Sequence, residues 1–305
     1  MRNPWSGGFT DDAEWKFATC QRPDGSYYGH SGAKCHKGVE ASLPEKAERV
    51  KKLLSMSSAE FESSYGKVRD QLMNDSCDEV VKRVTSSSPI DLSTDDLRRL
   101  ESAERMSGTL ERVEKFKTMG PRGEEAADKI LKTKEFFDDV KWNMGAEKTL
   151  ASEGSFDLAW EGINLTKNYA QESGESRSIW GQKRAGVAEH VVPTKVMKSE
   201  LIKSGVTDPK GILDFAIKRN FLSITSAPED IKFDQAKLTS SSPNPKDLMS
   251  RYKKVGIKTF MLNDSNLPKG KDHQTRITKS AAAAKEKGMT KEEWIASIVE
   301  GMENM

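Results

Sequence analysis

The chain has 305 residues, of which 35% are hydrophobic and 31% are charged, and its formal net charge is +2. This composition predicts a helix-rich protein with a thin core and room for two modest domains. No run approaches the ~18 consecutive apolar residues that span a bilayer, and the N-terminus has no apolar signal core, so we expect no membrane partner and a cytoplasmic location. The three cysteines, an odd number, argue against a secreted disulfide scaffold.

Residues 1–41 are predicted to form a hairpin module that is dense in turn-forming residues. Pro23-Asp24-Gly25 is a strong turn signal between short aromatic and β-branched stretches. Four side chains of this module could bind zinc: Cys20, His30, Cys35 and His36. Their spacing matches no familiar zinc motif, so we expect a reduced cysteine pair or a disulfide rather than zinc. A basic and aromatic contact with nucleic acid is a further interpretation of this segment.

Residues 42–174 predict a helical domain without strands and without catalytic groups. Ser42-Leu43-Pro44-Glu45 is a capping box with proline in the first turn, and Ser93 can cap a long amphipathic segment. Ser58 and Ser76 can cap two further helices. The helices are predicted at 43–54, 59–73, 77–85, 94–117, 122–143 and 155–171. We interpret this region as a helical bundle or arm.

Residues 175–305 differ, because strand-like and helix-like segments alternate there. The predicted strands are 178–181, 187–192, 220–225 and 257–262, and the predicted helices include 194–203, 209–218 and 228–238. The whole chain is therefore predicted as a mostly helical α+β protein. Residues 175–305 carry 23 Lys and Arg against 16 Asp and Glu, whereas residues 1–174 carry 26 against 31. The basic half suits a polyanionic partner, although ordinary solvated helix faces explain it equally well.

Glu189 and His190 stand side by side at the end of an apolar strand-like run, in a chain with only four histidines. Asn220 opens another strand-like run, which leads into a helix start at Glu229 and Asp230. This order resembles the HNH (His-Asn-His) nuclease family, and the resemblance implies a small ββα-metal domain within residues 175–305. In that family an acidic residue beside the first histidine binds a metal ion, the histidine is the general base, and the asparagine holds its loop.

The resemblance implies His190 as the base, Asn220 as the loop anchor and Glu189 as a metal ligand. The last histidine of the family has no counterpart here, and Glu229 and Asp230 stand at its position. Carboxylates are good oxygen ligands, so the implied cofactor is Mg²⁺ or Mn²⁺.

Basic residues near this motif could contact phosphates: Arg184, Lys195, Lys198, Lys218 and Arg219. His273 lies in a further basic segment, 268–276, which is predicted to be a loop that touches phosphate. The resemblance covers residues 177–260 and implies a metal-dependent DNA endonuclease of HNH type. A second resemblance, of the segment around Cys20 and Pro23 to a short module of cyanobacterial and cyanophage proteins, indicates a phage origin.

Other interpretations stay open. His190 can be a structural histidine between apolar strands, and Asn220 can simply end a helix, a position that asparagine favours. The protein would then be a phage particle or assembly protein, working as a homo-oligomer or with other particle proteins, or a DNA-binding module that does not cleave. An assembly protein would be located in the phage particle, whereas the nuclease would act in the host cytoplasm.

Overall fold

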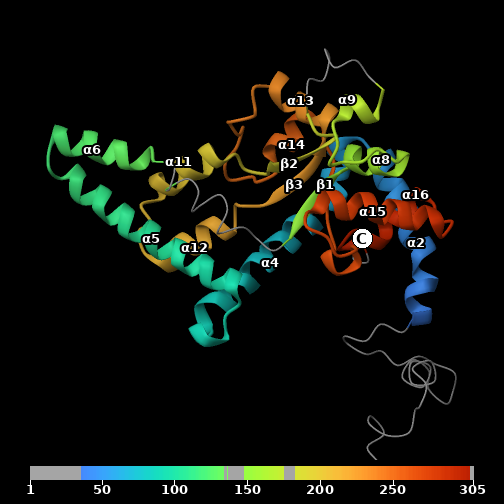
Figure 1. Cartoon of the computed structure of the whole chain (residues 1–305), viewed down its shortest axis with the longest axis horizontal. Helices are drawn as coiled ribbons and strands as arrows, with labels where there is room; N and C mark the ends of the chain where they lie inside the picture. Colours follow the sequence, from blue (N-terminus) through green and yellow to red (C-terminus); the bar gives the residue numbers. More distant parts are fainter. Residues whose placement is uncertain (1–35, 134–135, 137–147, 175–182, 303–305) are drawn as a thin grey trace, which may run out of the picture.

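The computed structural model describes residues 36–133, 136, 148–174 and 183–302, and it shows a mostly helical α+β protein. Four short strands form one mixed sheet, and helices lie against both of its faces (Figure 1). The predicted hairpin module with Cys20, His30 and Cys35 lies outside the described residues, as does the strand predicted at 178–181; His36 begins helix α2. Within the described residues, no helix is both long and apolar enough to cross a membrane.

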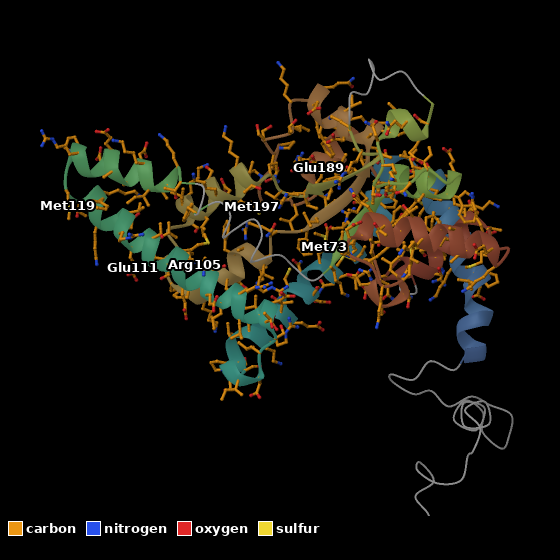
Figure 2. All side chains as sticks on the ribbon, in the orientation of Figure 1. Met73, Arg105, Glu111, Met119, Glu189 and Met197 are labelled. Carbon is orange, nitrogen blue, oxygen red and sulfur yellow. The ribbon has the colours of Figure 1, made fainter. Side chains whose placement is uncertain are left out.

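The chain is helical from position 36 up to position 131, apart from short turns. Its helices are α2 (His36–Ser55), α3 (Ser58–Phe61), a π-helical turn (Glu62–Gly66), α4 (Lys67–Ser86), a 3-10 turn (Pro89–Asp91), α5 (Thr94–Lys117) and α6 (Pro121–Leu131). Ser93 caps α5 as predicted, because its hydroxyl accepts a hydrogen bond from Asp96 N–H. Helices α5 and α6 form an arm that extends away from the sheet, with Met119 at its tip (Figure 2).

The helix break predicted at Ser76 is wrong. Ser76 is buried in the middle of α4, next to Cys77. The side chains of Met73, Cys77, Val80 and Val84 recur at helical spacing along one face and are all buried. The packing of this continuous face outweighs the tendency of a serine to cap a new helix.

The middle region contains a strand, so the prediction of a strand-free helical domain at 42–174 is wrong. Strand β1 (Thr149–Ser152) pairs in parallel with β3 (Leu222–Ser226) and antiparallel with β4 (Thr259–Met261). All four residues of β1 are buried, so its sequence lacks the alternation of polar and apolar residues that marks a half-exposed strand. Its strand conformation depends on partners from distant parts of the chain.

The strand order in the sheet is β2-β3-β1-β4, which places β2 (Gly186–His190) at one edge. Strands β2 and β3 pair as antiparallel neighbours. In this pairing Val187 lies opposite Thr225, and His190 lies opposite Leu222.

The two parallel strands lead directly into helices. Ser152 caps α8 (Glu153–Glu161), and Ser226 caps α13 (Ala227–Gln235). Gly162 ends α8 in a left-handed conformation with φ 91°, so the single helix predicted at 155–171 is wrong. The remaining elements are α9 (Tyr169–Glu172), α11 (Thr194–Ser204), α12 (Pro209–Ile217), α14 (Ser250–Val255), a 3-10 turn (Asp264–Asn266), α15 (His273–Glu286) and α16 (Lys291–Ile298).

Two apolar clusters lie on opposite faces of the sheet. Leu150 and Met261 belong to the cluster that includes α4, α5 and α12, whereas Ala151 and Phe260 belong to the cluster that includes α2, α8, α15 and α16. This division follows from the alternation of successive strand residues between the two faces. Both clusters take residues from each side of position 174, so the two segments predicted as separate domains share both cores.

Candidate functional site

Strands β2 and β3 carry the residues of the HNH resemblance. The expected order of strand, strand and helix is present, because α13 follows β3 directly. Glu189 lies opposite Ser223, and His190 lies opposite Leu222. Since neighbouring residues of a strand point to opposite faces of the sheet, the side chains of Glu189 and His190 point away from each other.

Glu189 is held by Arg251 of helix α14. Arg251 Nη2 donates to Glu189 Oε2 at 3.1 Å, and Arg251 Nη1 donates to His190 O at 2.9 Å. The Arg251 side chain is 1% exposed and lies over the ring of Phe233. Burial raises the pKa of the Glu189 carboxyl above its ordinary value; Arg251 opposes this rise, and the nearby Asp230 carboxylate adds to it. Glu189 is thus the partly exposed member of an ion pair whose arginine is buried.

Glu229 joins the ends of the two parallel strands. Its carboxylate accepts hydrogen bonds from Ser226 N at 2.9 Å, from Ser226 Oγ at 2.8 Å, from Gly154 N at 3.1 Å and from the Ser152 hydroxyl. Both carboxylate oxygens are therefore occupied by protein donors. The predicted role of Glu229 as a ligand of Mg²⁺ or Mn²⁺ does not fit this arrangement.

Asp230, the neighbour of Glu229, is bound to a lysine. Lys183 Nζ donates to Asp230 Oδ2 at 2.7 Å and to Asp234 Oδ2 at 2.9 Å. In the part of the chain that the structure describes, no three His, Cys, Asp or Glu side chains converge as ligands for one metal ion. An arginine binds Glu189, four neutral donors bind Glu229, and a lysine binds Asp230. These protein groups occupy the positions where a metal ion would bind. The predicted ligand set therefore does not fit Mg²⁺ or Mn²⁺.

Asn220 lies between α12 and β3 and is buried. Its backbone N–H donates to Ala216 O at 2.9 Å, which continues the hydrogen bonding of α12. The next residue, Phe221, accepts a hydrogen bond from Val191 N–H at 2.9 Å. Asn220 is therefore next to the segment that follows His190, as the resemblance implies.

The five basic residues predicted to contact phosphate do not gather at one place. Lys195 and Lys198 are on α11, where Lys198 lies over the ring of Phe136. Lys218 pairs with Asp78 at 3.1 Å and with Asp214 at 2.8 Å, and Arg219 stacks on the ring of Phe215, 4.0 Å from its centroid. Arg184 alone among the five lines the pocket described next.

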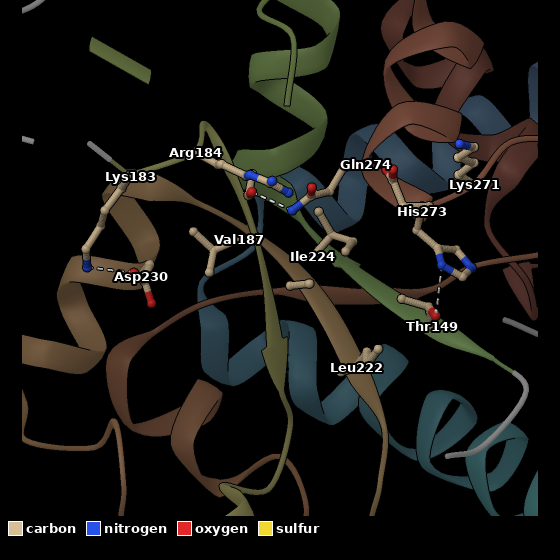
Figure 3. Close-up of a pocket in the computed structure, with 13 residues that line it drawn as sticks. Thr149, Lys183, Arg184, Val187, Leu222, Ile224, Asp230, Lys271, His273 and Gln274 are labelled. Atoms are coloured by element: carbon tan, nitrogen blue, oxygen red, sulfur yellow. Dashed lines mark hydrogen bonds and ion pairs between the residues drawn. The ribbon is translucent and has the colours of Figure 1, made fainter. Parts of the chain in front are cut away.

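A pocket of about 770 Å³ opens along β2, the edge strand. Figure 3 shows Lys183 and Asp230 on one side of it, with His273 and Gln274 of α15 on the other. Its lining residues are Thr149, Lys183, Arg184, Gly186, Val187, Ala188, Leu222, Ile224, Asp230, Lys271, Asp272, His273 and Gln274. Gln274 closes the pocket wall by donating from Nε2 to Gly186 O.

The charged groups of the pocket divide into paired and unpaired side chains. Asp230 pairs with Lys183, and Asp272 caps α15 by accepting a hydrogen bond from Thr275 N–H at 2.7 Å. Arg184 and Lys271 are exposed, and among the described residues no acidic side chain pairs with either of them. Within the described residues, the pocket therefore offers two cations without an acidic partner, while both of its carboxylates are engaged.

His273 begins α15 and is oriented by Asp264. His273 Nε2 lies 2.9 Å from Asp264 Oδ1, and Arg276 Nη1 donates to the same oxygen at 3.0 Å. Arg276 Nη1 also lies 3.2 Å from His273 Nε2, and His273 Nδ1 faces Thr149 Oγ1 at 3.5 Å (Figure 3), so both ring nitrogens have protein partners. Asp264, Arg276 and Thr149 therefore hold the imidazole of His273 in one orientation on the wall of the pocket.

Sequence reasoning missed Thr149, Lys183 and Lys271 as residues of one pocket. A signal exists for Lys271, because the segment around it is basic and Asp272 is a favoured residue for capping a helix. No local signal marks Thr149, since the strand that carries it was not predicted.

Comparison with protein-family models, with curated proteins and with solved structures finds no match for this chain. The geometry of the pocket is therefore the basis for a functional proposal.

Proposed function

We propose that the protein binds a single strand of nucleic acid, DNA in the first instance, in the pocket along β2. The observation that carries the proposal is the pair of exposed cations, Arg184 and Lys271, which have no acidic partner among the described residues. Arginine and lysine side chains of this kind contact the phosphates of a nucleic-acid backbone. The two cations come from segments far apart in the sequence and meet at one pocket.

The size of the pocket favours a single strand. A volume of about 770 Å³ falls in the ordinary range for small-molecule sites and accommodates one nucleotide. A base-paired duplex is much too wide to enter it. The basic balance of residues 175–305, which supply every pocket residue except Thr149, agrees with an anionic ligand.

Binding of a fluorescent oligodeoxythymidylate, followed by anisotropy, tests the proposal. Arg184→Ala with Lys271→Ala should weaken binding by at least about tenfold, because two charge-assisted phosphate contacts are lost. Lys279→Ala with Lys287→Ala is the matched control, since both lysines are exposed and the change in net charge is the same. Equal affinities of the two double variants would contradict a pocket-centred site.

The HNH-type endonuclease is a second candidate, favoured by the antiparallel pairing of β2 with β3 and by the helix that follows β3. Under this candidate, wild-type protein nicks plasmid DNA with Mg²⁺ or Mn²⁺, and His190→Ala abolishes nicking while DNA binding persists. Lys195→Ala with Lys198→Ala would then weaken DNA binding, whereas the pocket proposal predicts no change. A wild-type protein that nicks with neither ion contradicts the candidate.

A role in particle assembly makes the opposite predictions. The protein would form stable homo-oligomers or bind other particle proteins, and it would bind no oligonucleotide. That outcome would contradict both nucleic-acid proposals, which place the protein in the host cytoplasm.

A further inference from the structure

We infer that the outward-facing backbone N–H and C=O groups of Ala188, on strand β2, hydrogen-bond to the base of the bound nucleotide. This inference rests on the proposed function, because it takes the same pocket to hold one nucleotide of a single strand. It assigns the two parts of the nucleotide to different protein groups. Arg184 and Lys271 contact phosphate, and the backbone of Ala188 contacts the base.

The register of β2 determines where the backbone groups of Ala188 point. Strand β2 lies at the edge of the sheet, next to β3, and alternate residues of an antiparallel pair turn both their N–H and their C=O toward the partner strand. Val191 N–H donates to Phe221 O at 2.9 Å, so the odd-numbered residues face β3. Gly186 N–H donates away from β3, to Leu165 O at 2.8 Å. Ala188, two residues after Gly186, therefore directs both of its backbone groups away from β3.

Ala188 is the open position on this edge, because protein groups bind the outward carbonyls on either side of it. Gly186 O accepts a hydrogen bond from Gln274 Nε2, and His190 O accepts one from Arg251 Nη1 at 2.9 Å. Ala188 is exposed, and in the described part of the chain no hydrogen bond away from β3 involves its N–H or its C=O. A peptide strand that extended the sheet would need a longer run of open backbone. One donor and one acceptor suit a single base.

The pocket reaches the open edge at Ala188. Val187 and Ala188 both line it, although successive side chains of a strand point to opposite faces of the sheet. Figure 3 shows Lys183 and Gln274, two further lining residues, on opposite sides of β2. The pocket therefore extends around the edge of the strand, which is the direction in which the backbone groups of Ala188 point.

The chemistry of the bases matches this pair of groups. Each nucleobase carries a hydrogen-bond donor beside an acceptor on its Watson–Crick edge, and single strands are recognised through that edge when the bases are unpaired. A base within a duplex has this edge occupied, so contact with Ala188 requires an unpaired base. Val187, Leu222 and Ile224 supply aliphatic surface, and no Phe, Tyr or Trp is among the described lining residues. Contact with the base therefore depends on the hydrogen bonds at Ala188.

Three fluorescent probes of equal length test the contact with the base, by anisotropy. The first is oligodeoxythymidylate. The second is an abasic oligomer, which keeps every phosphate, and the third carries N3-methylthymine, which keeps the ring and lacks the N3–H donor. Wild-type protein should bind the second and the third probe about tenfold more weakly than the first, because the hydrogen bonds at Ala188 are lost.

Replacement of Ala188 by proline removes the backbone donor. Proline is tolerated on an edge strand where the N–H points out of the sheet. Ala188→Pro should bind oligodeoxythymidylate about three- to tenfold more weakly than wild type and the abasic oligomer equally well. Ala188→Ser keeps the N–H and is the matched control. Arg184→Ala with Lys271→Ala should weaken binding of all three probes by the same factor, because it removes phosphate contacts alone.

Amide hydrogen exchange of wild-type protein, followed by nuclear magnetic resonance, does not depend on the folding of any variant. Exchange at Ala188 should slow when oligodeoxythymidylate binds and should stay fast with the abasic oligomer.

Each outcome bears on one claim. Equal binding of all three probes by wild-type protein overturns the inference and leaves the phosphate-binding proposal standing. A folded Ala188→Pro protein that discriminates among the probes as wild type does, or an Ala188 amide that exchanges equally fast with and without oligodeoxythymidylate, also overturns it. Absence of binding to every probe means that the proposed function itself is wrong, and the open edge would then suit a peptide strand instead.

Discussion

Glu229 and Asp230 are adjacent in the sequence and have different roles in the structure. The sequence marks both as carboxylates at a helix start, which is as consistent with a metal ligand as with a capping residue. Ser152 and Gly154 decide between these two roles for Glu229, because they donate hydrogen bonds to its carboxylate. Their positions relative to Glu229 follow from the parallel pairing of β1 with β3. The hydrogen bonds from Ser226 to Glu229 at the start of α13 could be predicted from the local sequence. Those from Ser152 and Gly154 could not, because local patterns do not encode the pairing of β1 with β3.

Replacement of Glu229 by alanine should therefore destabilise the fold. Four donors lose their acceptor, two of them backbone N–H groups, and an unpaired buried donor costs about 1–3 kcal/mol. We expect the free energy of unfolding to fall by about 3 kcal/mol or more in urea denaturation. Lys232→Ala, an exposed change on the same helix, is the control. A Glu229→Ala protein of normal stability that had lost binding of a divalent ion would support the metal-ligand role instead.

Among the helices and strands, helix starts were the features best predicted from sequence. Ser93 caps α5 because its hydroxyl meets a helix N–H three residues further on, and α11 and α12 begin at the predicted positions 194 and 209. The same reasoning failed at Ser42, which lies inside α2, and at Ser76, where burial of the α4 face outweighs capping. It also failed at β1, whose strand conformation depends on distant partners.

The junction of α4 and α5 gives a pH-dependent prediction. Arg83 donates to both carboxylate oxygens of Asp96 at 2.9 Å, and Arg99 Nη1 donates to Oδ1 at 2.7 Å. Hydrogen bonds from Arg83 in particular, with those from Ser93 and Arg99, hold the pKa of Asp96 at about 2, below its usual 3.8. Because the folded pKa is lowered, the stabilisation is present above pH 3.8 and is lost as the pH falls through about 2.

Asp96→Asn should accordingly lower the free energy of unfolding by about 2 kcal/mol at neutral pH. Urea denaturation of both proteins at a series of pH values gives the difference between them. About half of this difference in the free energy of unfolding should remain at pH ~3, and the difference should vanish below about pH 2. A difference that does not change with pH would show that the charge of Asp96 does not supply the stabilisation.

On the scale of the whole molecule, the sheet joins parts of the chain that sequence analysis assigned to separate domains. Strand β1, from the segment before position 174, lies between β3 and β4 from the segment after it. Composition and helical periodicity predicted a mostly helical α+β protein correctly, since these are local properties. The strand order is a non-local property. Neither the position of β1 nor the presence of Arg184 and Lys271 in one pocket follows from any single window of sequence.

A fragment of residues 175–305 tests this architecture. Without β1 it lacks a central strand, and both apolar clusters lose buried residues from the first half of the chain. We expect the fragment to show no cooperative thermal transition by circular dichroism, and the full chain to show one. Cooperative melting of the fragment at the temperature of the full chain would mean that it is an independent domain after all.

The salt dependence of oligonucleotide binding tests the central claim most directly, because it counts the phosphates that the protein contacts. The slope of log affinity against log salt concentration changes by about 0.7 for each contact to a single strand. Arg184→Ala with Lys271→Ala should therefore make the slope shallower by about 1.4 relative to wild type. The account predicts that Lys279→Ala with Lys287→Ala and Lys195→Ala with Lys198→Ala keep the wild-type slope. An unchanged slope in the Arg184 and Lys271 variant, or an equal change in all three, would contradict the account.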